Sequence, residues 1–214
     1  MAIVRSVITA DIVNSEPSWA KELGIRLEQT IYASQPAAKV FFYRGDSFQS
    51  YLPDPFSTYR LALKLRTQAI LFEKDRPEVK TDVRLSIGIG SVDLPVNQLA
   101  TAEGEAFVLS GRSFDELQLK DRRLTIQSKD AKTNNSLQVI SLFTDFLFQS
   151  LTIKQAEVLE HLLNHRTQTE IAKMLRKSQS TINRHVQSMG WKQLEGLINL
   201  YEQSIQLLNT TPHG

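Results

Sequence analysis

Hydrophobic and polar positions alternate with two different periods along the first 150 residues. Runs rich in β-branched and aromatic residues predict strands at 3–10, 40–43, 48–52, 83–92 and 124–127. Apolar residues that recur every three or four positions predict helices at 15–33, 58–74 and 104–119. A short apolar run at 137–140 predicts one more strand. The order begins as a split β-α-β unit, so we expect an α+β fold with a ferredoxin-like sheet.

The predicted strand at 83–92 has two unlike faces. Its alternating residues are Leu85, Ile87 and Ile89 on one face and Ser86, Gly88 and Gly90 on the other. Because the second set is small, another backbone segment can approach that face closely.

The segment 40–52 predicts a hairpin with an acid at its tip. Two β-rich runs flank Gly45 and Asp46, which belong in a tight turn, and a second acid, Asp11, follows the first predicted strand. Such a pair of carboxylates can share a hard cation such as Mg2+ or Mn2+ and suits a triphosphate. The alternative is that Asp11 caps the next helix and Asp46 only holds its turn.

The segment after the first strand favours a phosphate-binding helix start. Ser15 is a good N-cap, and Pro17 is permitted in a first helical turn. The helix would then begin beside Asp11, where backbone N–H groups can receive phosphate. The candidate nucleotide-binding residues of this segment are Ile12, Val13 and Asn14.

Three shorter helices are predicted in the last third of the chain. Thr152 and Gln155 form a capping box before the first, the second covers 169–176, and Ser178 caps the third. In the third helix Ile182 and Val186 face inward. The candidate DNA-binding residues lie on its outer face and in the turn before it: Lys177, Ser178, Gln179, Ser180, Asn183, Arg184 and Gln187.

Charge supports this interpretation of the last third. The net charge of the whole chain is only +2, and residues 1–150 hold 18 basic and 18 acidic side chains. Between Arg166 and Lys192, however, there are six basic residues and one acid, Glu170. A local charge of +5 predicts a phosphate-facing surface, whereas its ordinary alternative is a solvated helix face.

Composition excludes several classes of protein. The 214 residues are 41% hydrophobic and 22% charged, which is typical of a globular chain with enough material for a core. No cysteine is present, which excludes disulfide scaffolds, thiolate zinc sites and cysteine nucleophiles. No run approaches the roughly 18 apolar residues of a membrane helix, and Met1 leads into a strand pattern, so we expect a soluble cytoplasmic protein.

Four motifs follow one another along the first two thirds of the chain. They are Ala10-Asp11-Ile12, Gly45-Asp46-Ser47-Phe48, Ser86-Ile87-Gly88-Ile89-Gly90 and the segment 104–112, G-E-A-F-V-L-S-G-R. In this order they resemble the landmarks of class III nucleotidyl cyclases. The phrases I-T-A-D-I-V-N-S, Y-R-G-D-S-F and G-E-A-F-V-L-S-G are similar to the SatD family of small bacterial proteins. The resemblance covers roughly residues 1–145.

The resemblance to cyclases implies roles for particular residues. Asp11 and Asp46 match the acids that bind two metals, and Arg112 matches the arginine that offsets charge on the phosphoryl group. Thr101 could touch a base edge. Two positions depart from the cyclase pattern, because the ribose-orienting asparagine is Val108 and the base-reading lysine or glutamate is Phe42.

Assembly is implied by the same resemblance. The cyclase site forms between two head-to-tail protomers, so Arg112 of one chain would face Asp11 and Asp46 of the other, and we expect a homodimer. The segment 194–208 is amphipathic enough for a dimer helix, and packing back on its own domain is the alternative.

The helical pattern of the last third resembles DNA-binding domains of the LuxR and sigma-factor type. The matching phrases are L-T-x-x-Q-x-E-V-L, E-I-A-x-x-L and S-x-x-T-I-x-x-H-V. The turn glycine of many such domains is Arg176 here and the next apolar residue is Lys177, so we expect a strained or more open turn.

These observations predict two domains, a nucleotidyl-cyclase-like domain at 1–145 and a helix-turn-helix domain at 150–210. A helix containing Leu142, Phe143, Phe146 and Leu147 would bridge them. The function we expect is a DNA-binding transcriptional regulator with a sensory or degenerate cyclase-like domain. The alternatives are an active metal-dependent nucleotide cyclase, or other phosphoryl-transfer enzyme, and a non-enzymatic assembly scaffold.

Overall fold

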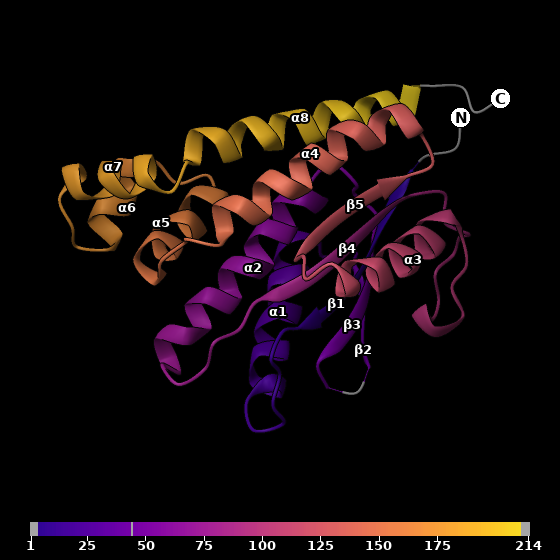
Figure 1. Ribbon diagram of the computed structural model, residues 1–214, viewed down its shortest axis with the longest axis horizontal. Helices are drawn as coiled ribbons and strands as arrows, with labels where there is room; N and C mark the ends of the chain where they lie inside the picture. Colours follow the sequence, from indigo (N-terminus) through magenta and orange to yellow (C-terminus); the bar gives the residue numbers. More distant parts are fainter. Residues whose placement is uncertain (1–3, 44, 211–214) are drawn as a thin grey trace.

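A sheet with helices on both faces forms the first part of the molecule, and a group of short helices and one long helix form the rest (Figure 1). The computed structural model describes residues 4–43 and 45–210. Ile3 of the first predicted strand and Arg44 of the predicted hairpin lie outside the described residues.

The sheet has five strands in the order β2-β3-β1-β4-β5. They are β1 (Arg5–Ile12), β2 (Lys39–Tyr43), β3 (Ser47–Leu52), β4 (Val83–Gly90) and β5 (Leu124–Ser128). With α1 (Ala20–Ser34) and α2 (Thr58–Asp75), the first four strands follow the chain order βαββαβ, and β1 is antiparallel to both β3 and β4. This is the predicted ferredoxin-like sheet of an α+β fold.

The fifth strand lengthens the sheet at one edge. It runs parallel to β4 and is reached through the short helix η1 (Leu99–Thr101) and α3 (Glu105–Leu119). The hairpin β2-β3 and the helices at 58–75 and 105–119 agree with the sequence pattern to within one or two residues.

The two faces of the sheet bury different kinds of side chain. Ile8, Leu85 and Ile87 belong to the same apolar core as Leu23 and Leu27 of α1. The opposite face carries small and polar residues, and α3 packs directly on it. Because alternate residues of a strand point to opposite faces, the sequence pattern of β4 sets which helices cover each one.

Gly88 permits the close approach of α3 to β4. A Cβ atom at this position would lie 2.1 Å from the Ala106 carbonyl oxygen and 2.6 Å from the Ser110 nitrogen. Beside it the Thr9 hydroxyl donates to Ser110 Oγ over 3.0 Å. The expectation that this face of the strand admits another backbone is therefore confirmed.

Two predicted elements are wrong. The segment 137–140 is not a strand but lies inside α4 (Ala131–Phe148), where Leu137, Ile140 and Thr144 are buried at helical spacing. A four-residue apolar run has no distinguishable period, so only its surroundings decide its structure. Asp130 caps this helix by accepting the Thr133 N–H.

The helix predicted from Ser15 begins at Ala20 instead. Ser15 does not act as its N-cap, because its hydroxyl donates to Asp46 Oδ2 over 2.6 Å. The preceding Asn14 has a φ of 56°, which turns the chain away from a helical path. A hydrogen bond to the hairpin tip thus replaces the local cap.

The last third is helical and begins as predicted. Its elements are α5 (Ile153–Leu163), α6 (Gln168–Met174), α7 (Gln179–Ser188) and α8 (Trp191–Thr210). Thr152 and Gln155 form the expected capping box of α5, and Thr167 and Glu170 form another before α6. Within the described residues, no helix combines the length and the hydropathy needed to cross a membrane.

The long helix α8 packs on the first part of the molecule. It lies along α4 in Figure 1, and Tyr201 packs against Tyr59 of α2 with ring centroids 5.4 Å apart. The Tyr201 hydroxyl also donates to the Pro55 carbonyl over 2.7 Å. The apolar face predicted for 194–208 is therefore buried within the chain. One continuous core joins the two predicted domains.

Arg66 holds three of these elements together. This α2 side chain is 2% exposed, and its Nε and Nη2 donate to Asp82, just before β4, over 3.1 and 2.7 Å. Its Nη1 donates to Asp145 of α4 over 2.8 Å, and the guanidinium lies 4.5 Å from the centre of the Phe148 ring. Because one buried guanidinium contacts Asp82, Asp145 and Phe148, the helices α2 and α4 and the start of β4 cannot shift independently.

We expect Gly88→Ala to destabilise the protein by several kcal/mol, because the new methyl group meets backbone atoms that cannot rotate away. Gly111→Ala on α3 is the matched control, since a Cβ there meets nothing within 4 Å. We expect it to stabilise by about 0.5–1 kcal/mol through helix propensity. Urea denaturation of both variants checks this, and equal effects would contradict the packing argument.

We expect Arg66→Met to cost about 3–5 kcal/mol, because it leaves Asp82 and Asp145 without their shared cation. Arg26→Met is the control. Arg26 also pairs with two acids and lies over a phenylalanine ring, but its side chain is 32% exposed. An exposed pair contributes about 0–1 kcal/mol, so the control should unfold at nearly the wild-type urea concentration.

Candidate functional site

Asp11 lies inside β1, one residue before its end, and its carboxylate is already paired. Its Oδ2 accepts hydrogen bonds from Arg84 Nη1 over 2.9 Å and from Gln118 Nε2 over 3.3 Å. Arg84 comes from β4 and Gln118 from α3, and the Asp11 side chain is only 16% exposed. Burial raises the pKa of Asp11 above its ordinary value, although Arg84 opposes this shift. The other oxygen, Oδ1, is buried without a hydrogen-bond partner.

Asp46 lies in the hairpin turn next to Asp11. Its two carboxylate oxygens accept from the hydroxyls of Ser15 over 2.6 Å and Ser47 over 3.2 Å. Its backbone carbonyl accepts the Ile12 N–H over 3.0 Å. The charge of Asp46 contributes to raising the pKa of Asp11, so the fold brings the two predicted acids together.

The pair is not arranged as an open site for a divalent metal. Arg84 already provides a positive charge at Asp11, which offsets part of the attraction that the two carboxylates would exert on a cation. Over residues 4–43 and 45–210, no three histidine, aspartate or glutamate side chains converge in a metal-binding group. Among the described residues of this site, Asp11 Oδ1 is buried without a donor and the neighbouring Arg84 Nε is buried without an acceptor.

The other predicted nucleotide-binding residues lie apart from the acid pair or are already bonded. The Ile12 and Val13 N–H groups donate to the carbonyls of Asp46 and Asp82, and the Asn14 amide donates to the Lys80 carbonyl. Thr101 in η1 and Arg112 on α3 are exposed. In the described part of the chain, no hydrogen bond or ion pair joins Arg112 to either acid.

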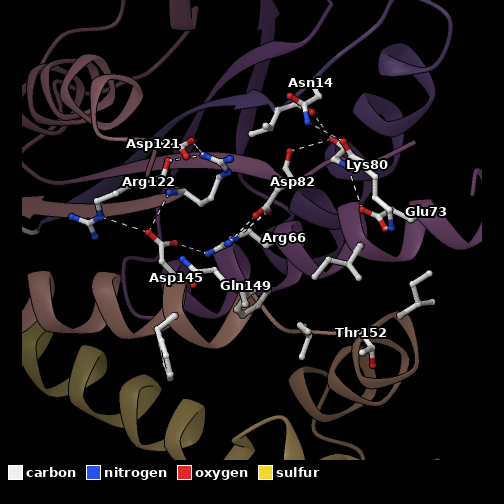
Figure 2. Close-up of a pocket in the computed structure, with 18 of the residues that line it drawn as sticks. Asn14, Arg66, Glu73, Lys80, Asp82, Asp121, Arg122, Asp145, Gln149 and Thr152 are labelled. Atoms are coloured by element: carbon white, nitrogen blue, oxygen red, sulfur yellow. Dashed lines mark hydrogen bonds and ion pairs between the residues drawn. The ribbon is translucent and has the colours of Figure 1, made fainter. Parts of the chain in front are cut away.

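A cavity that the sequence did not predict lies where the sheet meets α4 and α5 (Figure 2). Its volume is about 880 Å3. Asp82, Asp145 and Arg66 form part of its wall, and Thr152 lies on the α5 side. Acidic and basic residues of the wall pair with one another, as Lys80 does with Glu73 and Arg123 with Asp121. Its lining comes from many short segments, so no local motif could have revealed it.

The segment predicted as a helix-turn-helix forms α6 and α7, with the expected cap and buried positions in α7. Ser178 accepts the Thr181 N–H as the N-cap of α7, and Ile182 and Val186 are buried below it. Arg176 has a φ of 52°, which places a non-glycine residue in the left-handed region at the turn. This confirms the expected strain, because a side chain there costs roughly 1 kcal/mol or more.

The outer surface of α6, α7 and their turn carries cations without acidic partners. Lys173, Arg176, Lys177 and Arg184 are all exposed, and none has an ion pair in the described residues. The whole predicted DNA-binding set is exposed as well: Lys177, Ser178, Gln179, Ser180, Asn183, Arg184 and Gln187. Of these, Gln179 makes one long hydrogen bond, 3.4 Å to Thr169.

No protein-family model and no curated protein sequence matches the chain, so the resemblance to the SatD family stays a prediction. Among solved structures, a bacterial light-regulated adenylyl cyclase is distantly similar, with 14% identity and a TM-score of 0.40. That similarity covers 59% of this chain and 76% of the other. A second structure of a bacterial light-regulated adenylyl cyclase has 12% identity and a TM-score of 0.39, and there the match spans 43% of that chain.

Proposed function

We propose that this protein binds double-stranded DNA by placing α7 in the major groove. The observation that carries the proposal is the unpaired basic surface of α6, α7 and their turn, which coincides with a row of exposed amide side chains. Cations that have no acidic partner within the protein are free to neutralise phosphates and release counterions.

The side chains of α7 suit base recognition. Gln179, Asn183 and Gln187 recur every four residues, so they lie on one face of the helix. Amide groups can donate to and accept from adenine in the major groove, and Arg184 can bond guanine at two atoms. Ser178 and the first N–H groups of α7 would lie against the phosphate backbone, which sets the position of the helix.

The sheet-containing part would have a regulatory or sensory role in this proposal. Phosphoryl transfer depends largely on positioning and on compensated phosphate charge. Here the ribose-orienting position holds Val108, an apolar residue that is 49% exposed. The base-reading position holds Phe42, whose ring packs against that of Phe48 with centroids 5.0 Å apart. With Arg84 bonded to Asp11, these residues favour a degenerate cyclase-like unit over an active enzyme.

We expect fluorescence anisotropy of the intact protein to show salt-sensitive DNA binding. Lys177→Ala should weaken binding to all sequences and lower the slope against salt concentration. Arg184→Ala should cost about 1–3 kcal/mol, mainly at the preferred site. Lys21→Ala, an exposed lysine on α1, is the control and should leave the affinity unchanged. The proposal is wrong if no binding appears at low salt or if the three variants behave alike.

We also expect isothermal titration of the wild type with ATP or GTP to give no Mg2+- or Mn2+-dependent heat, because Arg84 already compensates the charge of Asp11 and the oxygens of Asp46 accept from two hydroxyls. Metal-dependent heat that disappears in a variant combining Asp11→Asn and Asp46→Asn would contradict this expectation. It would support the nucleotide-binding alternative, in which Arg112 of a second protomer completes the site.

A further inference from the structure

The outer face of α4 is apolar and uncovered. Val139, Leu142, Phe143 and Phe146 are 56%, 48%, 36% and 64% exposed. Their spacing of three and four residues puts them in one stripe along the helix, opposite the buried Leu137, Ile140 and Thr144 that face the core. The rings of Phe143 and Phe146 are stacked, with centroids 5.9 Å apart. We call these four residues the α4 stripe.

Within its own helix, which is described in full, the α4 stripe is flanked by no free charge. From Asn135 to Ser150 every exposed residue is apolar, an amide or a serine. The single acid of this segment, Asp145, is 13% exposed and bonded to Arg66. Interface centres are depleted of charged residues in the same way, whereas a helix face meant for solvent usually carries them.

We propose that the α4 stripe is the contact surface between two copies of this chain, related by a two-fold axis. The four positions are symmetric under reversal of the helix. Val139 and Phe146 lie equally far from the midpoint between Leu142 and Phe143, so two antiparallel α4 helices place Val139 opposite Phe146 and Leu142 opposite Phe143. A two-fold contact requires this kind of self-complementarity.

Charge also favours a second copy over a lipid surface. A two-fold axis brings each group near it close to its own equivalent, so a charged helix face would repel itself, and α4 exposes no charged side chain from Asn135 to Phe148. Helices that lie on anionic membranes carry lysine and arginine beside their apolar face, and α4 has no basic residue after Lys132. The two arginines that share a cavity wall with Leu142 and Phe146, Arg122 and Arg123, are paired with Asp145 and Asp121.

The dimer inferred here differs from the head-to-tail arrangement that the cyclase resemblance implies. It does not use Asp11, Asp46 or Arg112, and it does not depend on the proposed DNA binding. Because α4 is 18 residues long, or about 27 Å, the contact is small, and we expect micromolar association. Two copies of α7 would then be related by the same axis, as proteins that bind palindromic sites require.

Sedimentation velocity of the full chain over about 1–200 µM tests the proposal. The wild type should pass from monomer to dimer, and Phe146→Glu should weaken association by about tenfold or more by placing charge in the contact. Leu119→Glu is the control, because Leu119 of α3 is also an apolar residue, 89% exposed, but lies outside the stripe. It should dimerise like the wild type. Melting temperatures verify that both variants fold.

The orientation can be tested separately, because the chain has no natural cysteine. A mixture of Val139→Cys and Phe146→Cys proteins should form a disulfide-linked heterodimer under mild oxidation. Val139→Cys protein alone should cross-link poorly, since the Cα atoms of its two cysteines would lie more than about 7 Å apart in an antiparallel pair. A monomer at every concentration, unchanged dimerisation of Phe146→Glu, or preferred linkage of Val139→Cys to itself would overturn the proposal. So would binding of the monomer to phosphatidylglycerol vesicles through the stripe.

Discussion

The buried guanidinium of Arg66 is the interaction on which the arrangement of the molecule depends. It joins α2 to Asp82 at the start of β4 and to Asp145 on α4. The other oxygen of Asp145 accepts the backbone N–H groups of Arg123 and Leu124, where β5 begins. The Arg66 guanidinium therefore connects α2, the strands β4 and β5 at one edge of the sheet, and α4, the helix that follows β5. Two acids around a buried arginine stabilise only the correct arrangement, because any shift leaves a charge unpaired.

The helices of the last third depend on this connection. Arg66 positions α4, which carries Thr144. The hydroxyl groups of Thr144 and Tyr59 of α2 form a hydrogen bond of 2.7 Å, and α8 packs along α4. The helices α5, α6 and α7 are thus supported by the core of the sheet-containing unit, and the basic surface of α6 and α7 stays outside. The cavity beside Arg66 lies between these two parts, and its wall includes the start of α5.

The Asp11 carboxylate, to which the resemblance assigns a metal, is bonded by a side-chain cation, Arg84. An arginine held by β4 is always charged and cannot be exchanged, whereas a metal site forms only when ligands are open and suitably arranged. The pairing lowers the cost of burying the carboxylate, yet burial still raises its pKa and one oxygen stays without a partner.

What the sequence determined by itself was local. The hairpin at 39–52, the capping box at Thr152, the small face of β4 and the exposed face of α7 follow from propensity, capping and period, which depend on neighbouring residues. Only the tertiary structure decided that 137–140 is helical, that Ser15 bonds Asp46 instead of capping α1, and that Arg84 pairs with Asp11, 73 residues away. Each of these outcomes depends on residues outside the local pattern, so the pattern alone does not contain it. At Ser15 the contact with the distant Asp46 outweighs a local capping preference of about 1 kcal/mol.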